Sequence, residues 1–458
     1  MAQISYVKYS ELFYEFRNLR FDAEFFREEF LEIEDILKKL NSKYLNDNFF
    51  TSLITDGDHG NPVYSNESNS IPYLKVDEIT ETGIKLPSSH NLDFEYFQKQ
   101  SKKNHIEVND VLITTVGTIG KVCVVNSYFN AVLSRDIGKI KLTENLNPYF
   151  LQSFLSSKYG KLQMDRISSG GLQKGLYISH IKQILVPLLS QSFQLKIEEM
   201  VKSAYEKQKQ SKELYKEAEN LLLKELNLLD FKPKHQLFFT EHSKEVENSK
   251  RIDADYFQPK YKEIIQKIEE YEGGFDLVEN IVIFNEKNFI PENDKKYCYI
   301  PLSKVSNSGE IEVPEKEFGK NLPTRARRLL KTGDIILSSI EGSLETSALI
   351  DKEYNNFICS NGFYVFNSEK INSETLLILF KSKLMIELLQ RASKGTILGG
   401  YTKEELKKIK IPLLSNQIQQ QIADLVQESH KLRKESKQLL EDAKLKVEEE
   451  IEKEANKN

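Results

Sequence analysis

The stretch "VPLLSQSFQLKIEEMV" at 186–201 returns as "IPLLSNQIQQQIADLV" at 411–426, and this recurrence decides how the chain is organised. The same offset of 225 residues aligns the two halves without gaps from Asn147 onward. Both copies then continue as long polar stretches without proline or glycine, which predicts two long helices. A period of this length indicates duplication of a whole domain with its connector, not a solenoid of short repeats.

The first parts of the two copies also correspond, with small insertions between them. "RFDAEFF" at 20–26 matches "RIDADYF" at 251–257, and "DVLITTVGTIGKVCVV" from Asp110 matches "DIILSSIEGSLETSALI" from Asp334. Short apolar runs broken by Gly, Asn and Asp predict a strand-rich globular part in each copy. A helix, a Gly- and Ser-rich loop and the long helix follow it.

We therefore expect an α+β protein with an internal pseudo-two-fold repeat. Two similar mixed α/β domains are predicted at 1–189 and 231–414, and two long spacer helices at 190–230 and 415–458.

The two long helices carry a heptad pattern, with small or apolar residues every seven positions and larger apolar residues three beyond. Small side chains let two backbones approach closely, so we expect an antiparallel coiled coil of roughly 50–60 Å. The alternative is that each helix covers only its own domain. The predicted seam residues are Ile197, Met200, Ala204, Ser211, Leu214, Ala218, Ile422, Leu425, Ser429, Leu432, Ser436, Leu439 and Ala443.

Composition limits the class of protein. The net charge of −5 gives no overall basic signal, although acidic helices can mask one basic face. Three scattered cysteines fit reduced thiols, and their spacing predicts no zinc site. The chain lacks an apolar run of about eighteen residues and does not begin like a signal peptide. We expect a cytoplasmic protein without a membrane partner.

Three motifs invite a catalytic interpretation and fit it poorly. "GTIGK" at 117–121 lacks the spacing of a phosphate-binding loop, so a turn after a strand or a loop against DNA is favoured. "NPYF" at 147–150 lacks the second proline of an amino-methyltransferase motif, and helix capping by Asn147 explains it better. "DGDHGNP" at 56–62 fits a polar turn better than a metal site. The sequence predicts no catalytic residue, cofactor or metal.

Other segments favour contacts with DNA. "RISSGGLQKGLY" at 166–177 and "RASKGTILGGYT" at 391–402 occupy the same position in both copies and combine exposed backbone N–H groups with cations, which suits phosphates; a solvated loop is the alternative. "TRARRLLK" at 324–331 fits either a DNA-facing helix or an exposed polar face. The candidate DNA-binding residues are Asp58, His59, Thr118, Lys121, Arg135, Arg166, Ser168, Lys174, Arg325, Arg327, Arg328, Arg391, Lys394 and Thr396.

In the paired "RFDAEFF" and "RIDADYF" segments, the Gly loops and the "VPLL" and "IPLL" steps, the chain resembles the specificity (S) subunits of type I restriction–modification systems. The resemblance implies two target-recognition domains, each reading one half of a bipartite, asymmetric double-stranded DNA target. It also implies that the long helices set the half-site spacing and bind two methyltransferase (M) subunits, to which restriction (R) subunits add. Such a subunit catalyses nothing itself.

Two other interpretations stay open. The chain fits a single-chain DNA methyltransferase or endonuclease with this layout, which would bind its cofactor alone. It also fits a coiled-coil scaffold without DNA binding, in which the arginine-rich loops are incidental.

Overall fold

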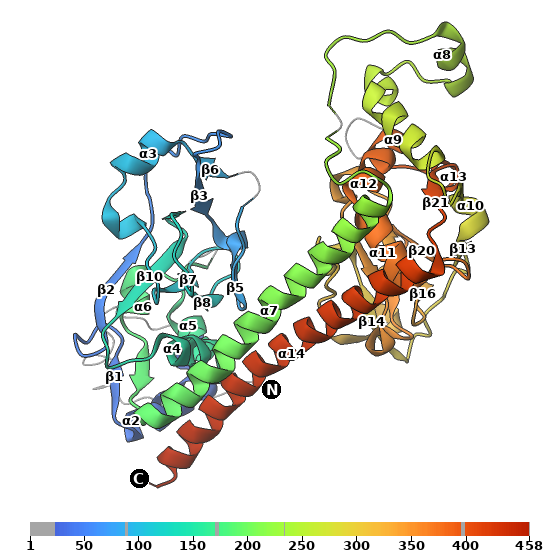
Figure 1. Cartoon of the computed structure of the whole chain (residues 1–458). Coiled ribbons are helices and arrows are strands. Elements are labelled where there is room, and N and C mark those ends of the chain that lie inside the picture. Colours follow the sequence, from blue (N-terminus) through green and yellow to red (C-terminus); the bar gives the residue numbers. More distant parts are fainter. Residues whose placement is uncertain (1–22, 88–89, 170–173, 233, 395–398, 458) are drawn as a thin grey trace. The chain divides into compact units, whose positions relative to one another are not determined.

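The computed structural model describes the chain except for residues 1–22, 88–89, 170–173, 233, 395–398 and 458 (Figure 1). Its contacts divide the chain into two units: unit 1 holds Met1–Gln210 and Leu432–Asn458, and unit 2 holds Ser211–Lys431. The long helices α7 (Gln191–Glu225) and α14 (Asn416–Ala455) each contribute one part to each unit. The finer domain limits given above stay predictions.

The centre of unit 1 is a four-stranded antiparallel sheet with both faces covered. Its order is β2 (Thr51–Asp56), β10 (Ile137–Leu142), β7 (Val111–Thr114) and β8 (Val122–Val124). Val111 and Ile113 belong to one core cluster with the aromatic residues of α4 (Pro148–Ser156), whereas Leu112 belongs to a second cluster. Successive residues of a strand point to opposite faces, so a run without polar alternation is buried on both sides.

Smaller elements complete the described part of unit 1. A three-stranded sheet has the order β6–β3–β9, in which β3 and β9 run parallel, and two strand pairs join β1 to β11 and β4 to β5. Their bounds are β1 Ser42–Tyr44, β3 Ile71–Leu74, β4 Ile79–Thr80, β5 Gly83–Ile84, β6 Asn91–Leu92, β9 Val132–Leu133, β11 Leu185–Pro187, η1 Ala23–Phe26, η2 Val76–Glu78, η3 Lys102–Asn104, α2 Glu28–Lys39, α3 Phe94–Lys99, α5 Lys158–Ile167 and α6 Ile178–Ile181.

Unit 2 repeats this topology. Its central sheet has the order β13–β20–β17–β18, and a second sheet contains the parallel pair β14–β19, which matches β3–β9. The repeat predicted from the sequence is therefore confirmed in the strand pairing. The bounds are β12 Phe275–Leu277, β13 Ile283–Phe284, β14 Lys296–Ile300, β15 Lys316–Phe318, β16 Ala326–Leu329, β17 Ile335–Ser338, β18 Ser347–Leu349, β19 Ile358–Ser360, β20 Phe363–Asn367, β21 Lys410–Pro412, α8 Ser243–Ser249, α9 Pro259–Glu269, α10 Val278–Ile281, α11 Ser373–Lys381, α12 Lys383–Ala392, α13 Lys403–Lys407, η4 Ala254–Phe257, η5 Leu302–Lys304, η6 Gly319–Asn321, η7 Glu341–Ser343 and η8 Lys352–Tyr354.

Helices α7 and α14 pack closely within each unit, as predicted. In unit 1, Ser436 Oγ donates to the carbonyl of Ala204 at 2.6 Å. In unit 2, Ser429 Oγ donates to the carbonyl of Ser211 at 2.7 Å. A hydroxyl reaches the backbone of a neighbouring helix only when small residues line the contact. Glu217 lies after Ser211 in α7, and it shares a hollow with Gln421, which lies before Ser429 in α14. The two helices therefore run antiparallel in unit 2.

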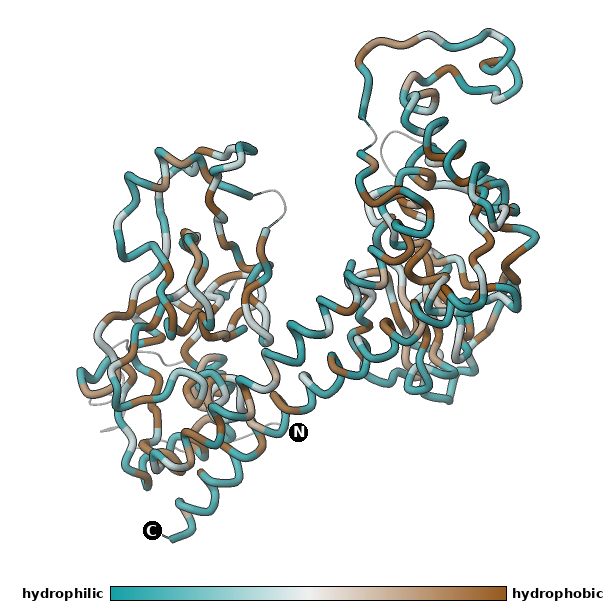
Figure 2. Tube along the Cα trace, viewed as in Figure 1, coloured by the Kyte–Doolittle hydropathy of each residue, from teal (hydrophilic) through white to brown (hydrophobic). Residues whose placement is uncertain are grey.

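The seam differs from a strict heptad in one respect. The residues at the predicted first position, from Ile197 to Ala218 and from Ile422 to Ala443, are fully buried. The leucines three beyond, such as Leu214, are only half-buried, whereas residues four beyond, such as Val201, are buried. Each helix covers both its partner and a globular part, so its apolar stripe is wider than a coiled-coil seam. Hydrophilic residues dominate the rest of both helices (Figure 2).

A buried tyrosine attaches α7 to the central sheet of unit 1. The Tyr205 hydroxyl accepts the Val124 backbone N–H at 3.1 Å and donates to Gln152 Oε1 at 2.9 Å. Gln152 Nε2 donates in turn to the Glu81 carbonyl at 2.9 Å. Burial raises the pKa of Tyr205, so its hydroxyl stays protonated as a donor. These bonds fix the register of the helix on its domain.

Asn147 is the N-cap of α4, and its side chain accepts from the Tyr149 and Phe150 backbone N–H groups. None of the described helices is both long and apolar enough to cross a membrane. The α+β class with two long helices is confirmed.

Candidate nucleic-acid interface

In unit 1 the first candidate segment is the turn that follows β2. Asp58 is buried, and its carboxylate accepts the Gly60 backbone N–H at 2.9 Å and the Tyr96 hydroxyl at 2.6 Å. Burial and the bond to Asp58 raise the pKa of Tyr96 to about 12, so this donor keeps its proton at neutral pH. Asp58 therefore shapes the turn, whereas His59 beside it has a side chain 62% exposed and bonds Asp56 at 2.8 Å.

A second turn lies against the first. Asp58 and Ser134 form an isolated parallel bridge, which brings the predicted residue Arg135 close to His59. The Arg135 side chain is 70% exposed, and its nearest carboxylate is Asp136 at 3.8 Å. An exposed guanidinium with one loose partner is available to a phosphate or to a guanine edge.

The loop between β7 and β8 joins the same edge of the sheet. Thr115 donates its backbone N–H to the Asp136 carbonyl at 2.9 Å, and Gly117 adopts a positive φ of 73° that favours glycine. Thr118 is exposed at the tip, and Lys121 is half-buried where β8 approaches. The "GTIGK" motif is thus a turn between two strands, as expected.

The described part of the Gly loop packs beside that turn. Leu176 donates its N–H to the Thr115 carbonyl at 2.8 Å, and Lys174 is exposed. Ser168 is buried, and its hydroxyl donates to the Met164 carbonyl at 2.6 Å, which closes helix α5. These four turns expose His59, Thr118, Arg135 and Lys174, and the half-buried Lys121 lies beside them.

Arg166 lies elsewhere. Its side chain is 8% exposed, and its guanidinium pairs with Glu34 at 2.5 Å, donates to the Phe25 carbonyl at 3.0 Å and stacks on the Phe25 ring. Burial alone would raise the pKa of Glu34, but bonds and charges from Arg166 and Lys38 hold it below the ordinary value. Arg166 therefore fastens η1 to α5, and this internal role replaces its expected phosphate contact.

Two residues beside the turns were not predicted from the sequence. Lys75 Nζ lies 5.3 Å from the centre of the half-exposed Tyr64 ring, and Ser134 donates its N–H to the Leu74 carbonyl. A cation held on an exposed aromatic face suits both phosphates and stacked bases. Tyr64 and Lys75 belong to separate apolar runs of the sequence, so the contact between them is revealed only by the strand pairing.

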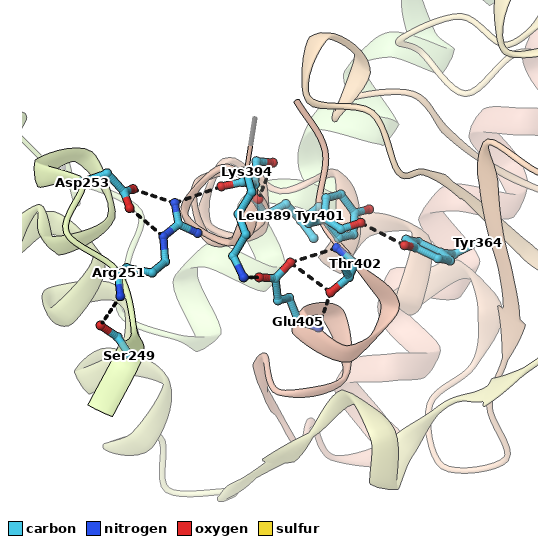
Figure 3. Close-up of polar contacts among 10 residues, drawn as sticks. Ser249, Arg251, Asp253, Tyr364, Leu389, Lys394, Tyr401, Thr402 and Glu405 are labelled. Atoms are coloured by element: carbon cyan, nitrogen blue, oxygen red, sulfur yellow. Dashed lines mark hydrogen bonds and ion pairs between the residues drawn. The ribbon is translucent and has the colours of Figure 1, made fainter. Parts of the chain in front are cut away.

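In unit 2 the corresponding turns also meet. Ile340 and Lys394 each form a bridge with Gly400, and Asn361 donates its N–H to the Arg325 carbonyl at 2.9 Å. Arg325 is exposed, whereas Lys394 is paired with Glu405 (Figure 3). Thr396 lies outside the described residues.

The basic cluster of unit 2 is a strand, so the helix alternative is wrong. Ala326–Leu329 form β16, which pairs with β19, and of its four residues only Ala326 is buried. Arg328 donates to the Glu286 carbonyl and to Asn288, and Arg327 donates to the Thr324 carbonyl. Both arginines therefore brace neighbouring loops.

Arg391 occupies the position of Arg166. Its Nε donates to the Tyr256 carbonyl at 3.2 Å, and its guanidinium stacks on the Tyr256 ring at 4.4 Å. The two repeated arginines thus hold the corresponding aromatic residues, Phe25 and Tyr256, in the two copies.

Comparisons with known proteins agree with the resemblance. Residues 275–442 match the family described as the type I restriction modification DNA specificity domain. Over 123 residues the chain is 27% identical to the type I restriction enzyme EcoBI specificity subunit of Escherichia coli, and this match covers 27% of the chain and about a quarter (26%) of that protein.

Solved structures of two such subunits are also similar. The S subunit of the type I system from M. genitalium has a TM-score of 0.41 and 13% identity, over 89% of this chain and 95% of that one. The HsdS subunit from Thermoanaerobacter tengcongensis has a TM-score of 0.29 and 14% identity, over 88% of this chain and 96% of that one.

Proposed function

Because residues 275–442 match the type I restriction modification DNA specificity domain, we propose that the chain is the DNA sequence-specificity subunit of a type I restriction–modification complex. It binds a bipartite, asymmetric target through one recognition domain in each copy. It catalyses nothing itself and directs two methyltransferase subunits, to which restriction subunits add, in the cytoplasm.

The observation that carries this proposal is that one strand topology presents different side chains in the two copies. The turn that offers Arg135 in unit 1 offers Asn361 in unit 2, at the same position after the parallel strand pair. Arginine pairs well with guanine, whereas asparagine pairs well with adenine. Two such heads would read unlike half-sites, as an asymmetric target requires.

Within unit 1 we assign two roles to the exposed groups. Lys121, Lys174 and Lys75 neutralise phosphates and fix the position of the domain on the duplex, which makes binding salt-dependent. His59 and Arg135, on the two turns held together by Asp58, reach base edges. Helices α7 and α14 set the spacing of the half-sites and offer their outer faces to the methyltransferase subunits.

The decisive experiment is to sequence the methylated bases of cells that express this chain with its partner subunits. We expect one bipartite motif with a fixed gap, and the motif should vanish when the chain is deleted. Methylation that persists without the chain would refute the proposal.

Two rivals give different results. A single-chain methyltransferase or endonuclease would bind its cofactor and modify DNA when purified alone. A scaffold without a DNA role would leave a mobility-shift assay unchanged in both the presence and the absence of a methyltransferase subunit.

A further inference from the structure

Unit 2 contains an open cavity of about 580 Å³ between α9, α12 and α13. Five basic side chains and two carboxylates line it, and the apolar part of its wall includes Ile265. Sites for small ligands commonly measure about 300–1,000 Å³, so the cavity has room for one. The basic residues are Arg251, Arg391, Lys394, Lys408 and Lys410.

Most of these cations already have a carboxylate partner. Arg251 holds Asp253 through two hydrogen bonds of 2.8 and 2.6 Å, and Lys394 pairs with Glu405 (Figure 3). Lys410 pairs with Glu269, outside the cavity lining. The second lining carboxylate, Glu404, is taken up by Lys407 at 3.1 Å.

Two cations remain without a counter-charge. Within the described part of the chain, no carboxylate lies within ion-pair distance of Arg391 or Lys408. Arg391 is nevertheless held rigidly, because its Nε bonds the Tyr256 carbonyl and its plane stacks on the Tyr256 ring. Arg251 stacks on the same ring at 4.5 Å. The two terminal nitrogens of Arg391 are thus aimed by the protein and left for another acceptor.

The first copy shows what belongs beside such an arginine. Aligning "RFDAEFF" with "RIDADYF" places Glu34 opposite Ile265, just as Arg166 is opposite Arg391. In unit 1, Glu34 neutralises Arg166 at 2.5 Å. In unit 2 the carboxylate is replaced by an apolar side chain that lines the cavity.

The lysines of the cavity also have no counterpart in the first copy. The offset of 225 residues pairs Lys394, Lys408 and Lys410 with Ser169, Gln183 and Leu185. The same offset pairs the lining glutamates Glu404 and Glu405 with Ser179 and His180, so unit 2 has gained three lysines and two glutamates here and has lost the carboxylate of Glu34. The change is a net gain of positive charge around Arg391. A guanidinium whose neighbouring carboxylate has been replaced by an apolar side chain offers its free donors to an external anion.

We propose that this cavity binds a phosphate group, free or carried by a larger molecule, in the place that the Glu34 carboxylate occupies in unit 1. A phosphate group carries a charge of about −1.5 to −2 at neutral pH, which matches two uncompensated cations, whereas a single carboxylate matches one. Its oxygens accept both terminal nitrogens of a guanidinium in parallel. This site does not depend on DNA reading by the chain.

The test exploits the internal comparison. Inorganic phosphate is titrated calorimetrically into the full-length chain, into Ile265→Glu and into Ile265→Gln, which has the same length and no charge. Ile265→Glu copies the arrangement that folds in unit 1, so its melting temperature should not fall. We expect it to weaken phosphate binding about tenfold or more, whereas Ile265→Gln stays within about threefold. Equal affinity for the two variants, or no binding by the natural chain, would overturn the proposal.

A second variant guards against misfolding of the first. Lys408 is exposed, so Lys408→Gln should fold normally and weaken phosphate binding by about threefold or more. Unchanged affinity of this variant would equally contradict the proposed site.

The source of the phosphate is distinguished in a competition experiment. If the natural ligand is the DNA backbone, a duplex without terminal phosphates should displace inorganic phosphate, and Ile265→Glu should bind that duplex less tightly. If the ligand is a phosphate monoester, phenyl phosphate should displace inorganic phosphate and the duplex should not. Displacement by neither compound would leave only an adventitious ion and refute the site.

Discussion

Replacing Glu34 by glutamine tests whether Arg166 serves the interior of unit 1 or the DNA. The substitution keeps the size of the side chain and removes the charge that compensates Arg166. It leaves the Phe25 carbonyl and the Phe25 ring as partners of the guanidinium.

The magnitude follows from burial. The Arg166 side chain is 8% exposed and that of Glu34 is 20% exposed, so solvent screens the pair only weakly. Removing one partner of a fully buried pair costs about 3–5 kcal/mol. Because Arg166 keeps its other contacts and Glu34 is partly solvated, we expect a loss of about 2–3 kcal/mol. For a domain of this size the melting temperature should fall by about 5–10 °C.

The same pair makes unit 1 sensitive to acid. The pKa of Glu34 in the folded chain is below the ordinary value of 4.5, so the unfolded chain binds more protons as the pH falls below that value. The contribution of the pair is therefore complete above the ordinary pKa and is lost as the pH falls through the folded pKa. Glu34→Gln should lack this part of the acid sensitivity.

The measurement is hydrogen exchange of the α2 peptide together with thermal unfolding at neutral and acidic pH. Glu32→Gln, an exposed position on the same helix, is the matched control and should change neither quantity. Arg166→Gln should reproduce the loss of stability and keep the slope of DNA affinity against salt. If Arg166→Gln leaves stability unchanged but flattens that slope, Arg166 contacts phosphate and the reasoning fails.

Three further predictions concern the helix attachment, base reading and spacing. Tyr205→Phe leaves the buried Val124 N–H unpaired, so the free energy of unfolding measured in urea should fall by about 1–3 kcal/mol. Tyr128→Phe, at an exposed site, is the control and should leave it unchanged. Equal effects of the two substitutions would refute the attachment. Arg135→Ala should weaken DNA binding by about 1–3 kcal/mol and relax the specificity at one target position. Lys99→Ala is the control, because Lys99 on α3 has a side chain that is 77% exposed, and it should change neither quantity. Unaltered affinity and specificity of Arg135→Ala would exclude Arg135 from the interface. Matched seven-residue insertions in α7 and α14 keep the seam in register and add about 10 Å, so the methylated motif should gain about three base pairs of gap with unchanged half-sites. Changed half-site bases with an unchanged gap would refute the spacing role.

Features that depend on regular spacing were predictable from the sequence. The duplication is visible as a constant offset, and the fully buried small residues of the seam recur every seven positions. The wider stripe that includes Val201 was not predicted, because a heptad describes contact with one partner helix and these helices also cover a globular part.

The partners of the charged side chains were much harder to predict from the sequence. Arg166 and Glu34 are far apart in the chain, and nothing in either segment shows that they meet. Asp58 is a similar case, because Tyr96 on a separate helix takes up its carboxylate and turns it into a support for the loop. The exposed residues His59 and Arg135 fit the prediction better, since the turns that carry them follow strands of adjoining sheets.

The repeat nevertheless contains a signal that separates structural residues from readers. Gln194 accepts the Asn147 N–H and donates to the Leu189 carbonyl, and Gln419 makes the same two bonds with Asn372 and Leu414. Ser168 and Ser393 likewise both donate to a carbonyl four residues earlier.

These identical pairs serve packing and capping, which are the same in both units. Two heads that read unlike half-sites must differ where they touch bases, as they do at Arg135 and Asn361. Identity between the copies therefore argues against base reading, and the repetition of Arg166 and Arg391 reflects their shared contacts with Phe25 and Tyr256. Ile265 shows the converse. The two copies differ at this position, beside Arg391, which both copies keep as an arginine. A ligand specific to one copy is therefore to be sought there.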